Sequence, residues 1–250
     1  MADMVFITGG NKGLGFETTR QLARRGATIL LGSRDARRGA EAARRLTAEL
    51  TGAGTPDPVA PAAGAVHAVE IDVISDESTE KAAAWVAAQF GHLDVLVNNA
   101  GITGGHVSPV DAGPDDFRLC YETNVFDPVR TTRAFLALLR LSAQPRIVMV
   151  SSGMGSLAVT TDPRRLESSL VSLVYPSSKA ALDMITTQYA KALAEIRINT
   201  VDPGCTATDL NGHSGHQTVE EGAEVIVRLA ATGADGPTGG YFDRNGTVPW

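Results

Sequence analysis

Short apolar runs alternate with longer helical patterns along almost the whole chain, and this alternation constrains the fold more than any other feature. The apolar runs have the length of strands and occupy residues 4–8, 28–32, 66–71, 93–97, 146–150 and 197–201. Between them, helical patterns occupy residues 13–25, 36–50, 76–90, 115–141, 175–195 and 218–232. Several runs are apolar at every position, which is typical of strands covered on both faces. We therefore predict a single α/β domain over residues 1–250, with a doubly wound, about seven-stranded parallel sheet and helices on both faces.

Charge and composition argue against several kinds of partner. The net charge of −6 disfavours nucleic acid or an anionic membrane as the main partner. No apolar run approaches the roughly 18 residues of a membrane span. The N-terminal residues have neither a basic region nor a cleavage site, so we expect a cytoplasmic protein. Cys120 and Cys205 are expected to be buried thiols, and His213 and His216 lack the partners of a metal site, so no metal is expected.

A glycine-rich turn, TGGNKGLG, joins the first predicted strand to the first predicted helix through Gly9, Gly13 and Gly15. Glycine permits the tight turn, lets a diphosphate approach the backbone, and lets the helix pack close to the strand. The beginning of the helix then offers free N–H groups to that diphosphate. Such a turn also occurs in many proteins simply as a connection between a strand and a helix, with no ligand. Its position after the first strand favours a dinucleotide site.

The end of the second predicted strand distinguishes between the two nicotinamide dinucleotides. NAD-binding proteins place a carboxylate there for the ribose hydroxyls. This chain instead has Ser33 followed by Arg34, and a guanidinium suits the 2′-phosphate of NADP(H). Lys12, in the glycine turn, can approach the same phosphate. Two alternatives stay open: Asp35 could read the ribose after a shift of one residue, and the arginines could simply be a solvated helix start.

Further motifs follow in an order that identifies a family resemblance. They are NNAG at 98–101, Asn124 in ETNVF, VSSGMG at 150–155, Tyr175 and Lys179 in a Y-x3-K pair, and DPGCTATD at 202–209. Together with the glycine turn, they resemble the classical short-chain dehydrogenase/reductase family over nearly the whole chain, and most of all its NADPH-dependent carbonyl reductase branch. The resemblance implies a Rossmann fold. The cofactor contacts that it implies are Gly9, Asn11, Lys12, Gly13, Leu14, Gly15, Ser33, Arg34, Asp72, Val73, Asn98, Ala100, Gly101, Tyr175, Lys179, Pro203, Gly204, Thr206 and Thr208.

The reacting centre that the resemblance implies contains Ser152, Tyr175, Lys179 and Asn124. Tyr175 and Lys179 lie four residues apart, hence on one face of a helix. A nearby ammonium group is expected to lower the phenol pKa by roughly two units, which would make Tyr175 a proton donor at neutral pH. The resemblance selects Ser152 rather than Ser151 to polarise a carbonyl group, and implies that Asn124 holds a water in a proton relay to Lys179. The alternative for Asn124 is a hydrogen bond to the local backbone.

These observations predict an NADPH-dependent oxidoreductase that reduces a ketone or aldehyde carbonyl to an alcohol, with Tyr175 as general acid. Two alternatives remain: an NAD-dependent alcohol dehydrogenase of the same fold, and a non-catalytic dinucleotide-binding sensor. Segments 153–173 and 205–217 follow strand ends and are predicted to form the substrate walls, while the Pro/Gly/Ala-rich segment 51–65 is predicted to be a surface insertion. Apolar residues in the two walls favour a small hydrophobic carbonyl compound. Both a monomer and a homo-oligomer fit the sequence.

Overall fold

A sheet of eight strands forms the centre of the computed structural model, which describes residues 2–52, 64–105 and 107–250. The strands are β1 Met4–Ile7, β2 Thr28–Ser33, β3 Val66–Glu70, β4 Val95–Asn98, β5 Arg146–Val150, β6 Arg197–Val201, β7 Tyr241–Asp243 and β8 Gly246–Thr247. Their order in the sheet is β3-β2-β1-β4-β5-β6-β7-β8. The first seven pair in parallel, which confirms the predicted fold class. Most of segment 51–65 lies outside the described residues.

The last strand departs from the predicted all-parallel sheet, because β8 pairs antiparallel with β7. The two strands form a hairpin closed by Arg244 and Asn245. The Asp243 carboxylate stabilises the turn by accepting the N–H groups of Asn245 at 2.7 Å and Gly246 at 2.8 Å. A two-residue connection of this kind can join only antiparallel neighbours.

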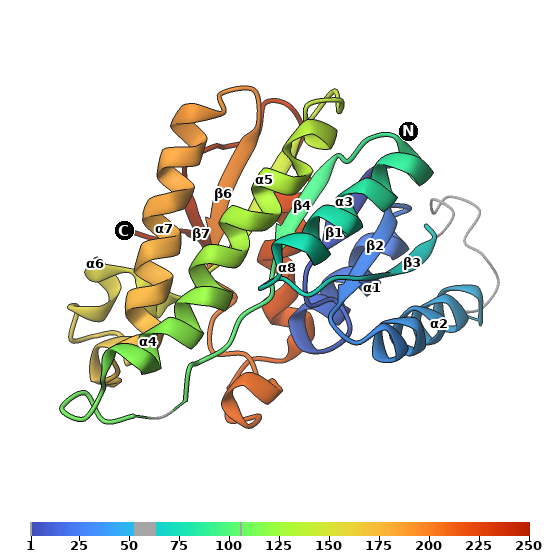
Figure 1. The fold of residues 1–250 in the computed structure, drawn as a ribbon. Helices are drawn as coiled ribbons and strands as arrows, with labels where there is room; N and C mark the ends of the chain where they lie inside the picture. Colours follow the sequence, from blue (N-terminus) through green and yellow to red (C-terminus); the bar gives the residue numbers. More distant parts are fainter. Residues whose placement is uncertain (1, 53–63, 106) are drawn as a thin grey trace.

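Helices cover both faces of the sheet (Figure 1). One layer contains α3 Asp76–Phe90, α5 Asp127–Leu139 and α7 Val174–Ala192. The other contains α1 Gly13–Arg24, α2 Ala36–Gly52 and α8 Val219–Ala230. Each layer buries an apolar cluster against the sheet, the first around Phe6 and Phe135 and the second around Ile7 and Val225. None of the helices in the described part of the chain has both the length and the apolarity needed to cross a membrane.

The predicted helix over 115–141 is confirmed as a helical segment over residues 114–139, but a π-helical turn interrupts it. Helix α4 spans Pro114–Tyr121 and the π turn spans Glu122–Phe126, directly before α5. Pro128 has no N–H group to donate to the carbonyl of Asn124, so the regular α-helical bonding pattern breaks at this point. The Asp127 N–H instead reaches back five residues to the carbonyl of Glu122.

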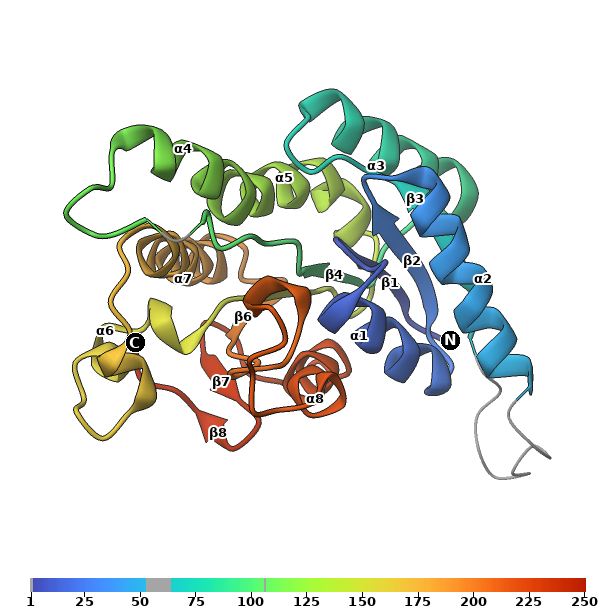
Figure 2. The same ribbon diagram turned by 90° about the horizontal axis from the view of Figure 1, so that it is seen from below.

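The loops that follow the parallel strands gather at one edge of the sheet, which Figure 2 views from below. The strand order reverses between β1 and β4, and ligands of such sheets bind at the strand ends beside this reversal. Both predicted wall segments lie at this edge. The first contains short helices at Gly153–Gly155, Leu157–Thr160 (α6) and Leu166–Ser169, and the second contains one at Asp209–Asn211 (η4).

Candidate active site

The glycine turn has the geometry of a diphosphate cradle. Gly9 and Gly13 have φ angles of +62° and +54°, a backbone conformation that favours glycine. A Cβ atom on Gly15 would lie 2.5 Å from the carbonyl oxygen of Gly9, so only glycine fits this close approach. Helix α1 begins after Lys12, which makes no side-chain capping bond, and has no acidic residue in its first turn. Its first N–H groups therefore fit an anion such as a diphosphate.

The end of β4 is held to the glycine turn by polar contacts between Thr8, Asn99 and Ala100. The Thr8 hydroxyl accepts the N–H groups of Asn99 and Ala100, each at 2.9 Å. The Asn99 side chain donates in turn to the carbonyl of Thr8 at 2.8 Å. The neighbouring Asn98 amide is buried and accepts the Thr131 hydroxyl at 2.7 Å. Its contacts belong to the scaffold and do not support the prediction that Asn98 binds the cofactor.

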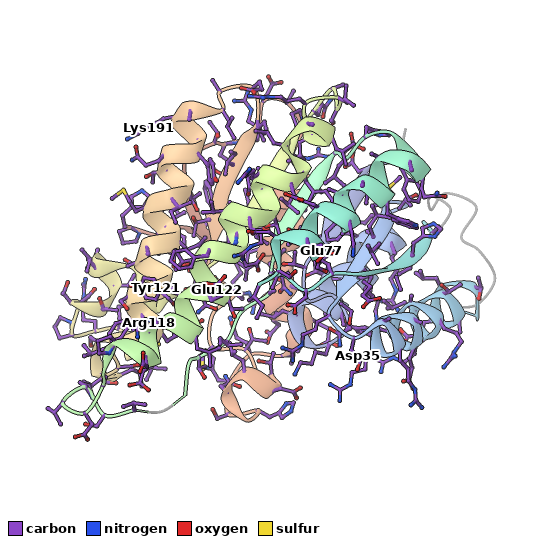
Figure 3. The ribbon with its side chains drawn as sticks, viewed as in Figure 1. Asp35, Glu77, Arg118, Tyr121, Glu122 and Lys191 are labelled. Atoms are coloured by element: carbon purple, nitrogen blue, oxygen red, sulfur yellow. The ribbon has the colours of Figure 1, made fainter. Side chains whose placement is uncertain are left out.

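At the tip of β2, the carboxylate of Asp35 caps helix α2. It accepts the Arg38 N–H at 3.0 Å, and this bond is the main reason why the Asp35 pKa is lowered. Figure 3 places Asp35 beside the beginning of α2, at the edge where the strands end. The Ser33 hydroxyl is buried and donates to the Asp35 carbonyl at 2.9 Å, so it stabilises the same turn. Arg34 next to it is exposed.

A cavity of about 260 Å³ lies between the glycine turn and α2. Its lining residues are Asn11, Lys12, Phe16, Arg38, Glu41, Ala42 and Arg45. The Arg45 guanidinium lies over the Phe16 ring at 4.1 Å from the ring centroid. Arg38, one of the arginines for which a solvated helix start was the alternative, lines this cavity together with Lys12. Its position one helical turn after Arg34 was the signal in the sequence.

The loop after β6 lies across the opening of the glycine turn. Thr208 lies opposite Gly13, where an added Cβ would be 3.7 Å from the threonine methyl group. The next residue, Asp209, pairs with the Lys12 ammonium at 2.7 Å and with the His213 ring at 3.0 Å. Figure 2 shows this segment with η4 beside the beginning of α1. The second predicted wall is thus brought to the candidate dinucleotide site.

The other predicted cofactor residues lie along the same edge. Pro203 and Gly204 form a turn in which Gly204 has a φ of +72° and Thr206 donates its hydroxyl to Pro203 at 3.0 Å. Asp72 and Val73 follow β3, where Val73 already accepts a hydrogen bond from Arg130 at 2.8 Å. The side chain of Leu14 turns away from the edge and packs against α8.

The predicted reacting residues come from the end of β5 and the beginning of α7. Ser152 begins the short helix Gly153–Gly155, and its hydroxyl accepts the Met154 N–H at 3.3 Å. Tyr175 lies in the first turn of α7 and is partly buried. The Lys179 ammonium is buried one turn further on, 5.7 Å from the centroid of the Tyr175 ring, and donates to the Val150 carbonyl at 2.8 Å. The structure thus brings Ser152, Tyr175 and Lys179 together.

The protonation of these groups differs from the prediction. Burial raises the pKa of the Tyr175 phenol well above its usual range, and the adjacent Ser152 hydroxyl only partly offsets the rise. Burial lowers the pKa of Lys179 to about 8. The prediction that Lys179 makes the phenol acidic is therefore wrong here, because loss of hydration outweighs the attraction of an amine that is directed at Val150. The phenol is held in its protonated form.

Asn124 connects α7 to the loop after β4. Its side chain accepts the Ile102 N–H at 2.9 Å and donates to the Ile102 carbonyl at 2.8 Å and to the Ser178 hydroxyl at 2.9 Å. A Cβ on Gly101 would lie 3.4 Å from the Asn124 amide oxygen and 3.6 Å from the Lys179 ammonium, so these groups are neighbours. The predicted polar network is present. The water relay stays a prediction, since the side-chain amide already has protein partners.

A doubly wound sheet with a glycine turn before its first helix, and with Ser152, Tyr175 and Lys179 at the strand ends, defines a dinucleotide-dependent oxidoreductase. The model of the short chain dehydrogenase family matches residues 3–219, so the chain belongs to this family. It is an enzyme that acts between CH–OH and C=O groups. Within the described residues, no group of three His, Cys, Asp or Glu side chains is arranged to hold a metal ion.

Curated relatives and solved structures match over almost the full length. The (+)-neomenthol dehydrogenase of Arabidopsis thaliana is 34% identical, with 95% of each chain covered. The (−)-isopiperitenone reductase of Mentha piperita is 33% identical, covering 96% of this chain and 95% of the relative. The structure of L-sorbose reductase from Gluconobacter frateurii, complexed with NADPH and L-sorbose, has a TM-score of 0.78 at 25% identity, covering 98% of this chain and 96% of that one.

Proposed function

We propose that the protein is an NADPH-dependent reductase that converts the ketone or aldehyde group of an apolar compound to an alcohol. The observation that carries this proposal is the grouping of the Ser152 hydroxyl, the Tyr175 phenol and the buried Lys179 ammonium at the strand ends. A general acid must carry its proton when the carbonyl oxygen becomes negative, and the Tyr175 phenol is protonated at neutral pH.

Each residue of the set has a distinct part in the proposal. The Ser152 hydroxyl donates a hydrogen bond to the substrate carbonyl and stabilises the developing oxyanion. Tyr175 then gives its proton to that oxygen. Lys179 lies below the ring as an ammonium group and is available to the nicotinamide ribose as a donor. Bound NADPH would supply the hydride, and a sensor that only binds the dinucleotide would have no use for these three side chains together.

The preference for NADPH over NADH is argued from the tip of β2. Asp35 was the one candidate there for binding the ribose hydroxyls of NADH, but its carboxylate is committed to the Arg38 N–H. Arg34 is exposed beside it, and Lys12 and Arg38 line the neighbouring cavity. Three cations and a committed carboxylate suit a 2′-phosphate better than a ribose diol. The complex of L-sorbose reductase with NADPH agrees with this preference.

The substrate walls are assigned to segments 153–173 and 205–217. The exposed large apolar residues in these walls are Leu157, Leu166, Leu170, Val171, Leu173 and Leu210. Apolar side chains that face solvent next to a reacting centre indicate an apolar ligand. Relatives named for neomenthol and isopiperitenone fit this substrate class.

Two measurements test the proposal. The first is a fluorescence titration of the protein with NADPH and with NADH, for which we expect at least tenfold tighter binding of NADPH. The second follows NADPH consumption over a panel of cyclic ketones, aldehydes and quinones. Tighter binding of NADH would support the NAD-dependent alternative. Tight binding of NADPH with no turnover over the whole panel would support the sensor.

A further inference from the structure

A group of polar side chains is buried beneath α7, behind the reacting residues. Thr200 of β6 pairs with Met149 of β5 and with Tyr241 of β7, so these side chains share the face of the sheet that α7 covers. Continuing along the strands by two residues, Ser151 and Asp202 lie on the same face. Helix α7 adds Asp183. We call this group the buried polar cluster; its members are Ser151, Asp183, Thr200, Asp202 and Tyr241, each at most 4% exposed.

Most polar atoms of the buried polar cluster lack a conventional hydrogen-bond partner. Both carboxyl oxygens of Asp183 and the hydroxyls of Ser151, Thr200 and Tyr241 have no partner of good hydrogen-bond geometry. The Ser151 hydroxyl nevertheless lies near enough to the Asp183 carboxyl to favour its ionised form. Asp202 differs, because it accepts the Gly204 N–H at 2.9 Å. An unpaired buried carboxyl is costly, with a penalty of about 1–3 kcal/mol or more. Its presence therefore requires an explanation other than fold stability.

Asp183 and Lys179 are buried on the same side of α7, although they form no direct ion pair. The two residues are one helical turn apart on α7 and both are 4% exposed. A Cβ on Gly155 would lie 2.6 Å from an Asp183 carboxyl oxygen and 2.9 Å from the Cβ of Lys179. A single glycine therefore gives both side chains room on the same side of α7. Asp183 is also the strongest of the groups that oppose the loss of the Lys179 charge on burial.

We propose that Asp183 is a positioning residue for the reaction, whose buried carboxylate keeps the neighbouring Lys179 amine charged beneath Tyr175, with the Ser151 and Tyr241 hydroxyls beside it. This inference rests on the proposed function, because it assigns Asp183 a role through Lys179. It explains why a carboxyl group is retained in a region that offers it few hydrogen bonds.

The direction of the pH effect follows from the groups that face this pair. Burial raises the pKa of Asp183 to about 7, with Ser151 and Lys179 opposing the rise and Asp202 adding to it. Burial lowers the pKa of Lys179 to about 8, with Asp183, Cys120 and Asp127 opposing the fall. Within the cluster, Asp202 and Tyr241 also have raised pKa values, and Glu167 and Asp243 face Asp202. The Tyr175 phenol, which faces the cluster, has a raised pKa as well. Between these two pKa values both Asp183 and Lys179 carry charge. Removal of the carboxylate must lower the Lys179 pKa further.

The test compares Asp183→Asn with the wild-type protein in two measurements. In the first, the rate of carbonyl reduction with NADPH is recorded from pH 6 to 10, and we expect its alkaline fall to move down by about one pH unit. In the second, acetylation of Lys179 by acetic anhydride is followed against pH by mass spectrometry. Only the neutral amine reacts, so the variant should be acetylated faster at pH 7 by up to about tenfold.

Thr186→Val is the matched control, since Thr186 is a buried polar residue of α7 that carries no charge. We expect it to leave both profiles in place. If Asp183→Asn does not fold, Ser151→Ala gives the same shift in a smaller amount, because Ser151 favours the ionised carboxyl. Unchanged profiles in the folded variants would overturn the proposal. A wild-type protein that reduces no carbonyl compound would instead refute the proposed function, and the acetylation profile would still decide the role of Asp183.

Discussion

Lys179 lies beneath the ring of Tyr175, with its ammonium 5.7 Å from the ring centroid, and donates its hydrogen bond to the Val150 carbonyl rather than to the phenol. The two residues share one face of α7, as their spacing requires. Their proximity does not make the phenol acidic, because burial dominates the pKa of Tyr175. In the proposed reaction, the protonated Tyr175 is the group that donates its proton to a carbonyl oxygen beside Ser152.

Replacement of Tyr175 by Phe removes the proposed proton donor and leaves the ring that packs above Lys179. We expect reduction of a ketone to fall by about 10²- to 10⁴-fold, the usual contribution of a general acid. Binding of NADPH, measured by fluorescence, should change little. Tyr189→Phe is the control, because Tyr189 lies on the same helix and packs against the apolar core. Full turnover by Tyr175→Phe would exclude Tyr175 as the acid.

The pH dependence of reduction should report the ammonium of Lys179. Its pKa is lowered to about 8, so the charged form is complete below pH 7 and is lost as the pH rises through 8. Tyr175 stays protonated over this range, since its pKa is raised. Initial rates at saturating NADPH should therefore be constant near neutral pH and fall at alkaline pH. A rate that rises from pH 7 to 9 would contradict this assignment.

Arg38→Ala tests the proposed site of the 2′-phosphate. Loss of one charge-assisted contact should weaken NADPH binding about tenfold and leave NADH binding unchanged, since NADH has no phosphate at this position. Arg37→Ala is a matched control, because Arg37 is exposed on the same turn and does not line the cavity. Isothermal titration of both dinucleotides measures the difference. An equal loss of affinity for NADPH and NADH would mean that Arg38 stabilises the first turn of α2 and does not bind the 2′-phosphate.

The parts of the fold that could be predicted are those that local sequence determines. Strands β1 to β6 are short and mostly apolar runs, and the burial of β1, β2, β4, β5 and β6 on both faces is visible in composition alone. The edge strand β3 is largely exposed. The hairpin of β7 and β8 was missed, because strands of three and two residues are too short to show a pattern. The π turn was missed because its side-chain pattern hardly differs from that of a helix. Pro128 was the one local signal for it.

The site also contains residues that local sequence predicts and contacts that only the folded chain creates. The glycine turn, Ser152, Tyr175 and Lys179 follow from motifs, and Asp35 as a helix cap could have been read from its place before α2. The partners of Lys12 and Asn124 could not be read in this way. Lys12 meets Asp209 across 197 residues of sequence, and Asn124 meets Ser178 across 54. The pKa of Tyr175 was mispredicted for a related reason, since burial is a property of the packed molecule.

Gly15→Ala tests the close approach within the glycine turn. The added Cβ would lie 2.5 Å from the carbonyl oxygen of Gly9 and 2.6 Å from the Asn99 amide, so the turn must open. We expect loss of NADPH binding and a free energy of unfolding lower by about 1–3 kcal/mol, measured in urea. Gly52→Ala is the control, because nothing lies within 4 Å of its added Cβ. A stable Gly15→Ala variant with normal NADPH binding would show that the turn is not the diphosphate cradle.

Asp209→Asn tests whether the wall segment 205–217 competes with the cofactor for Lys12. The Lys12–Asp209 pair is 2.7 Å long and largely exposed, and such a pair is worth at most about 1 kcal/mol. If Lys12 must leave Asp209 to reach a 2′-phosphate, removal of the carboxylate should tighten NADPH binding by about two- to fivefold at low salt. Binding of NADH should not change. The gain should also shrink at high salt, because both contacts are exposed to screening.

Two controls make this prediction specific to Lys12. Glu80→Gln removes one negative charge from α3 and should leave NADPH binding unchanged, which excludes an effect of net charge. In a Lys12→Ala background, Asp209→Asn should have no further effect, because the group for which it competes is gone. A gain that persists without Lys12, or that is equal for NADH, would mean that Asp209 acts on the wall segment itself. Because only a Lys12-dependent gain confined to NADPH requires the exchange of partners, this double-mutant comparison decides whether Lys12 links the wall to the cofactor.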